Sequence, residues 1–196
     1  AIPTYNRAAF LRQTLESLCL QVARTPVHVE VLVSDNCSND GTAQVCESAQ
    51  RTWGFVRVLR NPENIGAELN VLQSMRQSSG KWIWLFGDDD IVLPGAVAFL
   101  LESIERASDD LGLILLNYGQ LDKDGITVLS RGVCNAPDGW HGNFLDFFDF
   151  KGSFDILGFI SALVIRSDNI DYSNDYEKFN SYYAHIGYLI QSFWCK

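Results

Sequence analysis

The chain has 196 residues, and its composition excludes several classes of protein before any motif is considered. It carries 15 lysines and arginines against 24 aspartates and glutamates, and the resulting net charge of −9 disfavours a nucleic-acid-binding protein. An apolar content of 47% is too high for a disordered chain. The sequence contains no run of about 18 apolar residues, so it predicts no membrane span. We therefore expect one compact domain.

The cysteines indicate the redox environment of the protein, and the start of the chain bears on whether it is secreted and whether it is part of a longer protein. The five cysteines are odd in number and show no C-x-x-C spacing, which favours reduced cytosolic thiols over a disulfide or zinc framework. The start of the chain lacks the apolar run of a signal peptide. Because the chain opens at Ala1 with almost no lead-in to its first strand, we expect it to be part of a longer protein.

Hydrophobic periodicity predicts short strands alternating with amphipathic helices, which is the pattern of a sheet covered by helices. After a strand end at the start of the chain, the predicted elements are a helix over 11–22, a strand over 27–34, a weaker strand over 55–59, a helix over 69–75, a strand over 82–86, a helix over 97–104 with Pro94 in its first turn, and strands over 113–116 and 162–165. The pattern becomes less regular and richer in aromatic residues from about residue 117. We therefore divide the domain into halves, 1–116 and 117–196.

Three consecutive carboxylates, Asp88, Asp89 and Asp90, follow the predicted strand over 82–86. They cannot all remain ionised at close range without a compensating cation. A hard divalent ion, Mg²⁺ or Mn²⁺, suits oxygen ligands that have no cysteine or histidine cluster beside them. The alternative is a solvated acidic turn that caps the following helix.

Three further polar segments stand at predicted strand ends or turns, where open α/β sheets bind ligands. Asp35 follows the strand over 27–34 and can accept hydrogen bonds from a base or ribose, whereas a capping role fits Asp40 better. The loop over 3–7 carries one arginine, which suits a diphosphate. The turn over 61–66 ends in a glycine that allows a ligand to approach the backbone. The glycine-rich motifs of P-loop and dinucleotide-binding proteins are absent.

Taken together, these motifs resemble the family 2 glycosyltransferases with the GT-A fold. The similarity covers residues 2 to about 101 and rests on I-P-T-Y-N-R, V-L-V-S-D-N-C-S-N-D-G-T, N-P-E-N-I-G-A and W-L-F-G-D-D-D-I-V-L-P. The G-D-D-D sequence and a later F-I-S-A-L-V-I-R are similar to the abequosyltransferase-type branch, which builds bacterial surface polysaccharides. The resemblance implies an α/β, Rossmann-like fold with a mostly parallel central sheet flanked by helices.

The resemblance also implies roles for individual residues. It places the nucleotide sugar against residues from all four motifs: Pro3, Thr4, Asn6, Arg7, Asp35, Asn64, Gly66 and Asp88. Asp35 would hydrogen-bond the base. In the position of the family's D-x-D element, Asp89 and Asp90 would hold Mg²⁺ or Mn²⁺.

The implied activity is metal-dependent, inverting transfer of a sugar from a nucleotide-diphosphate sugar to a glycan or lipid-linked acceptor. A metal on the phosphates would stabilise the leaving group, and a general base would take the proton of the acceptor. The Glu-Asp pair of many relatives is missing, and His185 lies near its place. We expect His185 to be the base or an added metal ligand, with a buried structural role as the alternative. Asp155 is the reserve candidate for the base.

Two other classes of function stay open on this evidence. A nucleotidyltransferase also uses carboxylates and Mg²⁺, but the loop over 3–7 lacks the glycines of its activating loop. A non-catalytic sugar-nucleotide-binding module would explain the missing acidic pair, although it has no need for adjacent carboxylates. A nucleotide-sugar donor implies a cytoplasmic enzyme. A lipid-linked acceptor would bring it to the inner face of the cell membrane as a peripheral protein.

Overall fold

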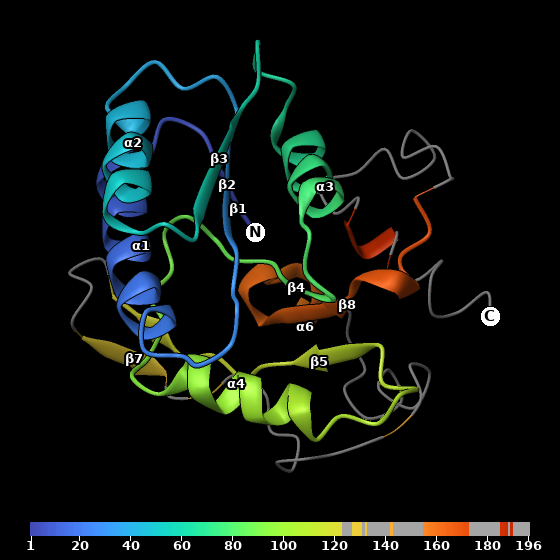
Figure 1. Ribbon diagram of the computed structural model, residues 1–196. Helices are drawn as coiled ribbons and strands as arrows, with labels where there is room; N and C mark the ends of the chain where they lie inside the picture. Colours follow the sequence, from blue (N-terminus) through green and yellow to red (C-terminus); the bar gives the residue numbers. More distant parts are fainter. Residues whose placement is uncertain are drawn as a thin grey trace.

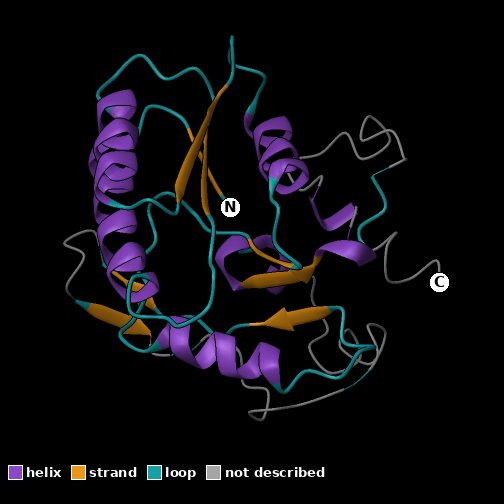
Figure 2. Ribbon diagram, viewed as in Figure 1, coloured by secondary structure: helices purple, strands orange, loops and turns teal. Residues whose placement is uncertain are grey.

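The protein contains a β-sheet with helices on both faces (Figure 1). The computed structural model describes residues 1–122, 127–130, 132, 142, 155–172, 185–187 and 189. The elements, in chain order, are β1 (Ile2–Thr4), α1 (Ala8–Val22), β2 (Val31–Asp35), α2 (Thr42–Thr52), β3 (Val56–Arg60), α3 (Ala67–Gln77), β4 (Trp82–Trp84), α4 (Ala96–Glu105), β5 (Leu113–Leu115), β6 (Gln120–Leu121), β7 (Val128–Ser130), α6 (Asp155–Gly158), the 3₁₀ turn η1 (Ile160–Ala162), β8 (Leu163–Arg166) and the 3₁₀ turn η2 (Ser167–Asn169). Figure 2 shows α1 and α2 on one side of β1–β3 and α3 on the other.

Six of the strands form two three-stranded groups that meet edge to edge, and β6 pairs with β7 in a separate two-stranded sheet. The first group is parallel, in the order β1-β2-β3, and the second has the order β4-β8-β5 with β8 antiparallel to both neighbours. Ala1 joins the groups, because its nitrogen donates to the Trp84 carbonyl at 2.8 Å and its own carbonyl accepts from the Phe86 nitrogen at 2.9 Å. This is the bonding pattern of parallel neighbours. The expected mostly parallel α/β sheet is therefore confirmed, with β8 as the antiparallel strand.

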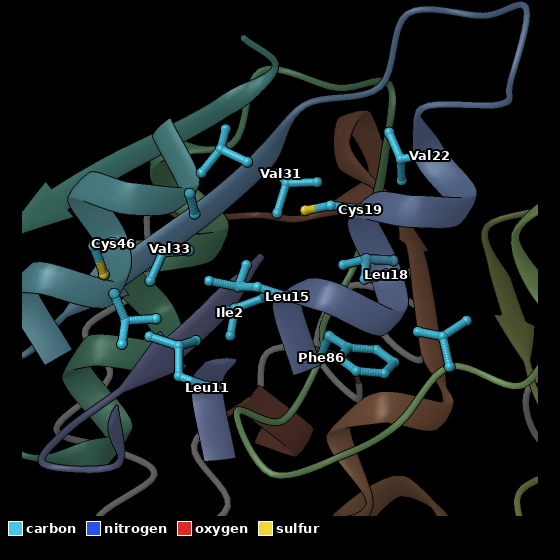
Figure 3. Close-up of a cluster of buried hydrophobic side chains, with 14 of the residues drawn as sticks. Ile2, Leu11, Leu15, Leu18, Cys19, Val22, Val31, Val33, Cys46 and Phe86 are labelled. Atoms are coloured by element: carbon cyan, nitrogen blue, oxygen red, sulfur yellow. The ribbon is translucent and has the colours of Figure 1, made fainter. Parts of the chain in front are cut away.

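Two apolar clusters cover the two faces of the sheet. In the first, the helical stripe of α1 packs on the strands, as Figure 3 shows for Leu11, Leu15 and Leu18 facing Ile2 and Val33. The second cluster joins α3 to β4, β8 and α6, and its fully buried members include Leu72, Met75, Leu85, Leu157, Leu163 and Ile165. Most residues of the helical stripes predicted from spacing are thus core, as expected for amphipathic helices, whereas Leu69 and Ile104 are only partly buried.

Two predicted boundaries are wrong for identifiable reasons. The strand expected over 27–34 begins only at Val31, because the pairing with β3 starts there, and Val27 is 49% exposed. Helix α4 begins at Ala96 rather than beside Pro94. Gly95 precedes it with a φ of 85°, a left-handed conformation that glycine adopts without steric cost.

Three of the five cysteines lie in the described part of the structure. Cys19, Cys37 and Cys46 are free, and burial raises the pKa of Cys19 and of Cys46 to about 12, so both stay protonated. Cys134 and Cys195 lie outside the described residues. None of the helices in the described part of the chain combines the length and hydrophobicity needed to cross a bilayer.

His185, the first candidate for the general base, lies in the second apolar cluster. It is 6% exposed, and its Nε2 lies 3.2 Å from the carbonyl oxygen of Leu157 in α6. Burial lowers the pKa of the imidazole, which keeps the ring neutral near pH 7. Asp155, the reserve candidate, is the first residue of the same short helix, and its side chain lies outside the described part of the structure. Both candidates therefore belong to one region around α6.

Asn70 of α3 ties its helix to the strand ends. Its side chain is buried, and its Nδ2 donates to the Ser34 carbonyl at 2.9 Å. Its Oδ1 accepts from the Ser34 hydroxyl at 2.7 Å and from Asn61 Nδ2 at 3.1 Å. One amide thus connects α3 to β2 and to the residue that follows β3.

We expect Asn70→Ala to lower the free energy of unfolding by about 2–4 kcal/mol, because it leaves several buried polar groups without partners. Urea denaturation measures the change. Ser74→Ala is the matched control, since Ser74 is also buried on α3 but donates only within the helix, to the Val71 carbonyl at 2.7 Å. An equal loss in both variants would contradict the proposed role of Asn70.

The lowered pKa of His185 predicts a pH-dependent stability. Between the folded pKa and about 6.5 the unfolded chain binds the proton more tightly, so stability is highest above pH ~6.5 and falls on acidification. Urea unfolding at about pH 7.5 and about pH 5.5 should show a larger loss in the wild type than in His185→Gln. His28→Gln, which removes an exposed histidine, should behave as the wild type. The same pH dependence in all three proteins would exclude this explanation.

Candidate functional site

The four sequence motifs meet at one edge of the sheet. Thr4, Asp35 and Arg60 end β1, β2 and β3 and are paired with one another in the ladder register. Because these strands are parallel, the loops that follow them leave from the same edge. The turn over residues 87–90 is hereafter called the acidic turn. Its carboxylates Asp88 and Asp89 form ion pairs with Arg7, which lies in the loop after β1.

Arg7 is the cation that the acidic turn contacts. Its Nη1 lies 2.5 Å from Asp89 Oδ2 and 3.4 Å from Asp88 Oδ1. The two carboxylates differ in exposure, because the Asp88 side chain is 10% exposed and that of Asp89 is 47% exposed. The half-exposed guanidinium of Arg7 therefore pairs with one buried carboxylate, Asp88, and one half-exposed carboxylate, Asp89.

The acidic turn holds more negative charge than this guanidinium balances. Burial raises the pKa of the Asp88 carboxyl, and repulsion from Asp89 adds to the effect, while Thr4 and Arg7 oppose it. Burial also raises the pKa of the Asp90 carboxyl. A further cation at the turn would therefore be favourable.

Asp90 is held by a residue from the second half of the chain. Its Oδ2 accepts a hydrogen bond from the Ser161 hydroxyl, whose oxygen accepts from the Gly87 nitrogen at 2.7 Å. A Cβ on Gly87 would lie 2.6 Å from Asp90 Oδ2 and 3.3 Å from Asp89 Oδ1, so the turn requires glycine for space. Ser161 was missed by sequence reasoning, which used F-I-S-A only as a family similarity.

The residues of the acidic turn fit a hard divalent cation. Carboxylate oxygens are the ligands that Mg²⁺ and Mn²⁺ prefer, and the space beside Gly87 brings oxygens of Asp89 and Asp90 toward one point. Among the described residues there is no group of three or more histidine, cysteine, aspartate and glutamate side chains arranged to hold a metal. The fit is thus to an ion that takes one or two protein carboxylates and completes its shell with water and phosphate.

Asp35 occupies the predicted position but is already engaged by the protein. It is 1% exposed, its Oδ2 pairs with Arg60 Nη1 at 2.8 Å, and its Oδ1 accepts from the Ser38 nitrogen at 3.0 Å. Arg60 Nη2 also donates to the Ser38 carbonyl at 2.7 Å. Each carboxylate oxygen retains a second lone pair for a base. Arg60 was missed, because only the strand register places it opposite Asp35.

The loop after β1 is tied to the loop after β2. Pro3 and Thr4 belong to β1, so the loop itself starts later than predicted. Asn6 has a φ of 52°, and its Oδ1 accepts from the Asn39 nitrogen at 2.8 Å. Asp40 accepts from the nitrogens of Thr42 at 2.8 Å and Ala8 at 3.1 Å, so it contributes to capping both α2 and α1.

Asn64 and Gly66 belong to a network of side-chain amides. Asn64 Oδ1 accepts from the Gly66 nitrogen at 2.9 Å and from Asn36 Nδ2 at 2.8 Å. Asn36, which is buried, accepts from Asn61 Nδ2 and from the Ile65 nitrogen, each at 3.0 Å. Asn36 and Asn61 were missed. The sequence signal for each was an asparagine directly after a strand, β2 for Asn36 and β3 for Asn61.

Curated relatives match the first part of the chain. It is 32% identical over 109 residues to the abequosyltransferase RfbV of Salmonella typhimurium, covering 55% of this chain and 32% of that protein. It is 28% identical over 102 residues to the GalNAc(5)-diNAcBac-PP-undecaprenol beta-1,3-glucosyltransferase of Campylobacter jejuni, covering 52% of this chain and 32% of that protein. The chain thus spans about a third of the length of these relatives. The similarity to the abequosyltransferase-type branch is confirmed.

Solved structures share the fold over most of the chain. S. aureus TarS 1-349 superposes with a TM-score of 0.71 at 18% identity, covering 98% of this chain and 53% of that one. The complex of TarS 1-349 with UDP-GlcNAc superposes with a TM-score of 0.64 at 19% identity, covering 86% and 44%. At this level of identity the likeness concerns the fold, which is GT-A as predicted.

The family assignment follows from the motifs and from a match to a whole family model. The model described as Glycosyl transferase family 2 matches residues 1–149, a span that holds the acidic turn, Arg7, Asp35 and the amide network. The predicted family is therefore confirmed, and the chain belongs to glycosyl transferase family 2.

Proposed function

We propose that this chain carries the donor site of an enzyme that moves a sugar from a nucleotide-diphosphate sugar to a glycan or lipid-linked acceptor in bacterial surface polysaccharide synthesis. The observation that carries the proposal is the acidic turn, whose Asp88 and Asp89 face Arg7 at the same sheet edge as Asp35. The names of related proteins support the substrate classes. TarS has been solved with UDP-GlcNAc and with UDP, and the Campylobacter relative's name contains an undecaprenol-linked glycan.

Different residues of the proposed site contact different parts of the nucleotide-sugar donor. Asp35, oriented by Arg60, accepts a hydrogen bond from the base, and Asn64 and Gly66 lie along the nucleoside. Asp88 faces the ribose and the sugar. Pro3, Thr4 and Asn6 shape the pocket wall that ends in Arg7.

Asp89 and Asp90 would hold Mg²⁺ or Mn²⁺, ions that carboxylate oxygens suit. When bound, this ion neutralises the charge that develops on the leaving diphosphate. A Mn²⁺ ion is also present in the GDP-Man complex of the mannosyltransferase PcManGT from Pyrobaculum calidifontis, which superposes with a TM-score of 0.56. Arg7 then turns from Asp89 to the diphosphate, a change that its half-exposed position allows.

Transfer proceeds with inversion. The acceptor hydroxyl forms a bond to the anomeric carbon as the bond from that carbon to the phosphate oxygen breaks on the opposite face. A general base takes the hydroxyl proton. His185 is the first candidate because it is neutral near pH 7, and Asp155 is the second. Comparison of kcat for His185→Gln and Asp155→Asn assigns the role, since loss of the base lowers kcat more than donor affinity.

The metal assignment is tested by Asp89→Asn. Calorimetry with UDP, GDP, CDP and dTDP, with and without Mn²⁺, should show metal-dependent binding of at least one nucleotide to the wild type. Asp89→Asn should weaken that binding about tenfold or more, because a ligand to the ion is lost. Glu105→Gln, which neutralises an exposed carboxylate at the end of α4, should bind as the wild type.

Two results would contradict the proposal in different ways. Unchanged Mn²⁺-dependent binding in Asp89→Asn would show that the metal site is misplaced. Nucleotide binding without donor hydrolysis or sugar transfer, measured on the full-length enzyme, would favour a non-catalytic sugar-nucleotide-binding module.

Arg7→Gln tests whether the guanidinium and the divalent ion compete for Asp89. Removing the cation should raise the affinity for Mn²⁺ alone about two- to fivefold, the size expected for an exposed ion pair. The same change should weaken binding of the nucleoside diphosphate, because the charge that would meet the phosphates is gone. Free Mn²⁺ is measured by electron paramagnetic resonance. Arg12→Gln, at an exposed position of α1, is the control. Weaker Mn²⁺ binding in Arg7→Gln than in the wild type would refute competition.

A further inference from the structure

Ser161 connects the second half of the chain to the acidic turn. It lies beyond residues 1–149, which the family model covers, yet its hydroxyl is buried against Gly87 and Asp90. The hydroxyl donates its only proton to Asp90 Oδ2 and accepts the Gly87 N–H. Its proton is therefore committed to a single carboxylate of the turn.

The main chain of Ser161 is itself held in place. Its carbonyl accepts a hydrogen bond from Trp84 Nε1 at 2.8 Å, and the carbonyl of Leu163, which begins β8, accepts from the Leu85 nitrogen at 3.0 Å. β8 runs between β4 and β5 and bonds to both. The serine thus lies in η1, the 3₁₀ turn directly before a strand that is bonded on both sides, and a side chain with such a rigid support can fix the geometry of a site.

The opposite side of the acidic turn is held by α1. Thr14 Oγ1 lies 2.9 Å from the carbonyl oxygens of both Asp88 and Asp90. Thr14 thus constrains the backbone, while Ser161 constrains the Asp90 side chain. What remains is the direction of the Asp88 and Asp89 carboxylates, and both face Arg7.

We propose that Ser161 is a positioning residue for the donor site: by holding Asp90 over Gly87, it sets the conformation in which Asp89 is open to a divalent cation. This inference rests on the proposed function and adds a residue from the second half of the chain. Gly87 completes the arrangement, because any side chain there would displace the Asp90 carboxylate. Asp90 then orients the turn in addition to being one of the two residues that would hold the ion.

The experiment measures the affinity of purified full-length enzyme for Mn²⁺ alone, at a temperature where every variant is folded. Ser161→Ala should bind Mn²⁺ about tenfold more weakly, the usual effect of losing a residue that orients a metal ligand. Ser161→Thr keeps the hydroxyl and should recover most of the affinity. Ser167→Ala is the matched control, because this serine follows β8 and its hydroxyl donates to the Lys81 carbonyl at 3.0 Å, away from the acidic turn. It should bind as the wild type.

A double-mutant cycle separates positioning from a general loss of structure. If Ser161 acts through Asp90, Ser161→Ala should have no further effect on Mn²⁺ affinity in an Asp90→Ala background. Gly87→Ala, which pushes Asp90 away without altering Ser161, should weaken Mn²⁺ binding as Ser161→Ala does. This variant decides the question if Ser161→Ala does not fold.

Three results would overturn the inference. Wild-type affinity in Ser161→Ala or Gly87→Ala, with Mn²⁺ binding to the wild type intact, would refute it and leave the proposed function standing. An additive loss in the double variant would mean that Ser161 acts by another route. Absence of Mn²⁺ binding in the wild type, with or without a nucleoside diphosphate, would reject the proposed metal site and the inference with it.

Discussion

Charge compensation at one edge of the sheet is the constraint on which this site depends. Parallel strands deliver their carboxyl ends to the same edge, so Asp35 and the acidic turn lie at one edge of the sheet, and both Asp35 and Asp88 are buried there. Buried carboxylates need cations or hydrogen-bond donors to stay charged. The protein supplies Arg60 to Asp35 and Arg7 to Asp88 and Asp89. The carboxylates differ in burial, because Asp35 is buried whereas Asp89 is half exposed, and our proposal is that a ligand opens the pair between Arg7 and Asp89.

Neutral groups position the loops around these charges. Asn36, Asn61 and Asn70 hold three strand ends and the start of α3 through side-chain amides, which adds no charge to an acidic region. A fully bonded buried network gives one defined conformation, because each broken bond would leave a polar group without a partner. The loops at this edge of the sheet are therefore held in one defined arrangement by the protein's own hydrogen bonds.

The second half of the chain contributes directly to this edge. β8 enters between β4 and β5, although it lies far from both in sequence, and the turn before it carries Ser161 into contact with Asp90. The two halves of the chain consequently share one sheet. The Ser161 side chain is thus a direct contact between the turn that precedes β8 and the acidic turn.

The sequence by itself determined the α/β class, the helical core stripes, the four motifs and the family, because periodicity and local turn chemistry are written in consecutive residues. Tertiary structure decided which charges meet. Arg60 opposite Asp35 depends on strand register, and Ser161 beside Asp90 depends on an antiparallel strand inserted from 71 residues away. It also placed His185 against Leu157, in a buried environment that no local pattern distinguishes from an open site. Contacts between distant segments follow from packing, and a single sequence read along its length contains no direct record of them.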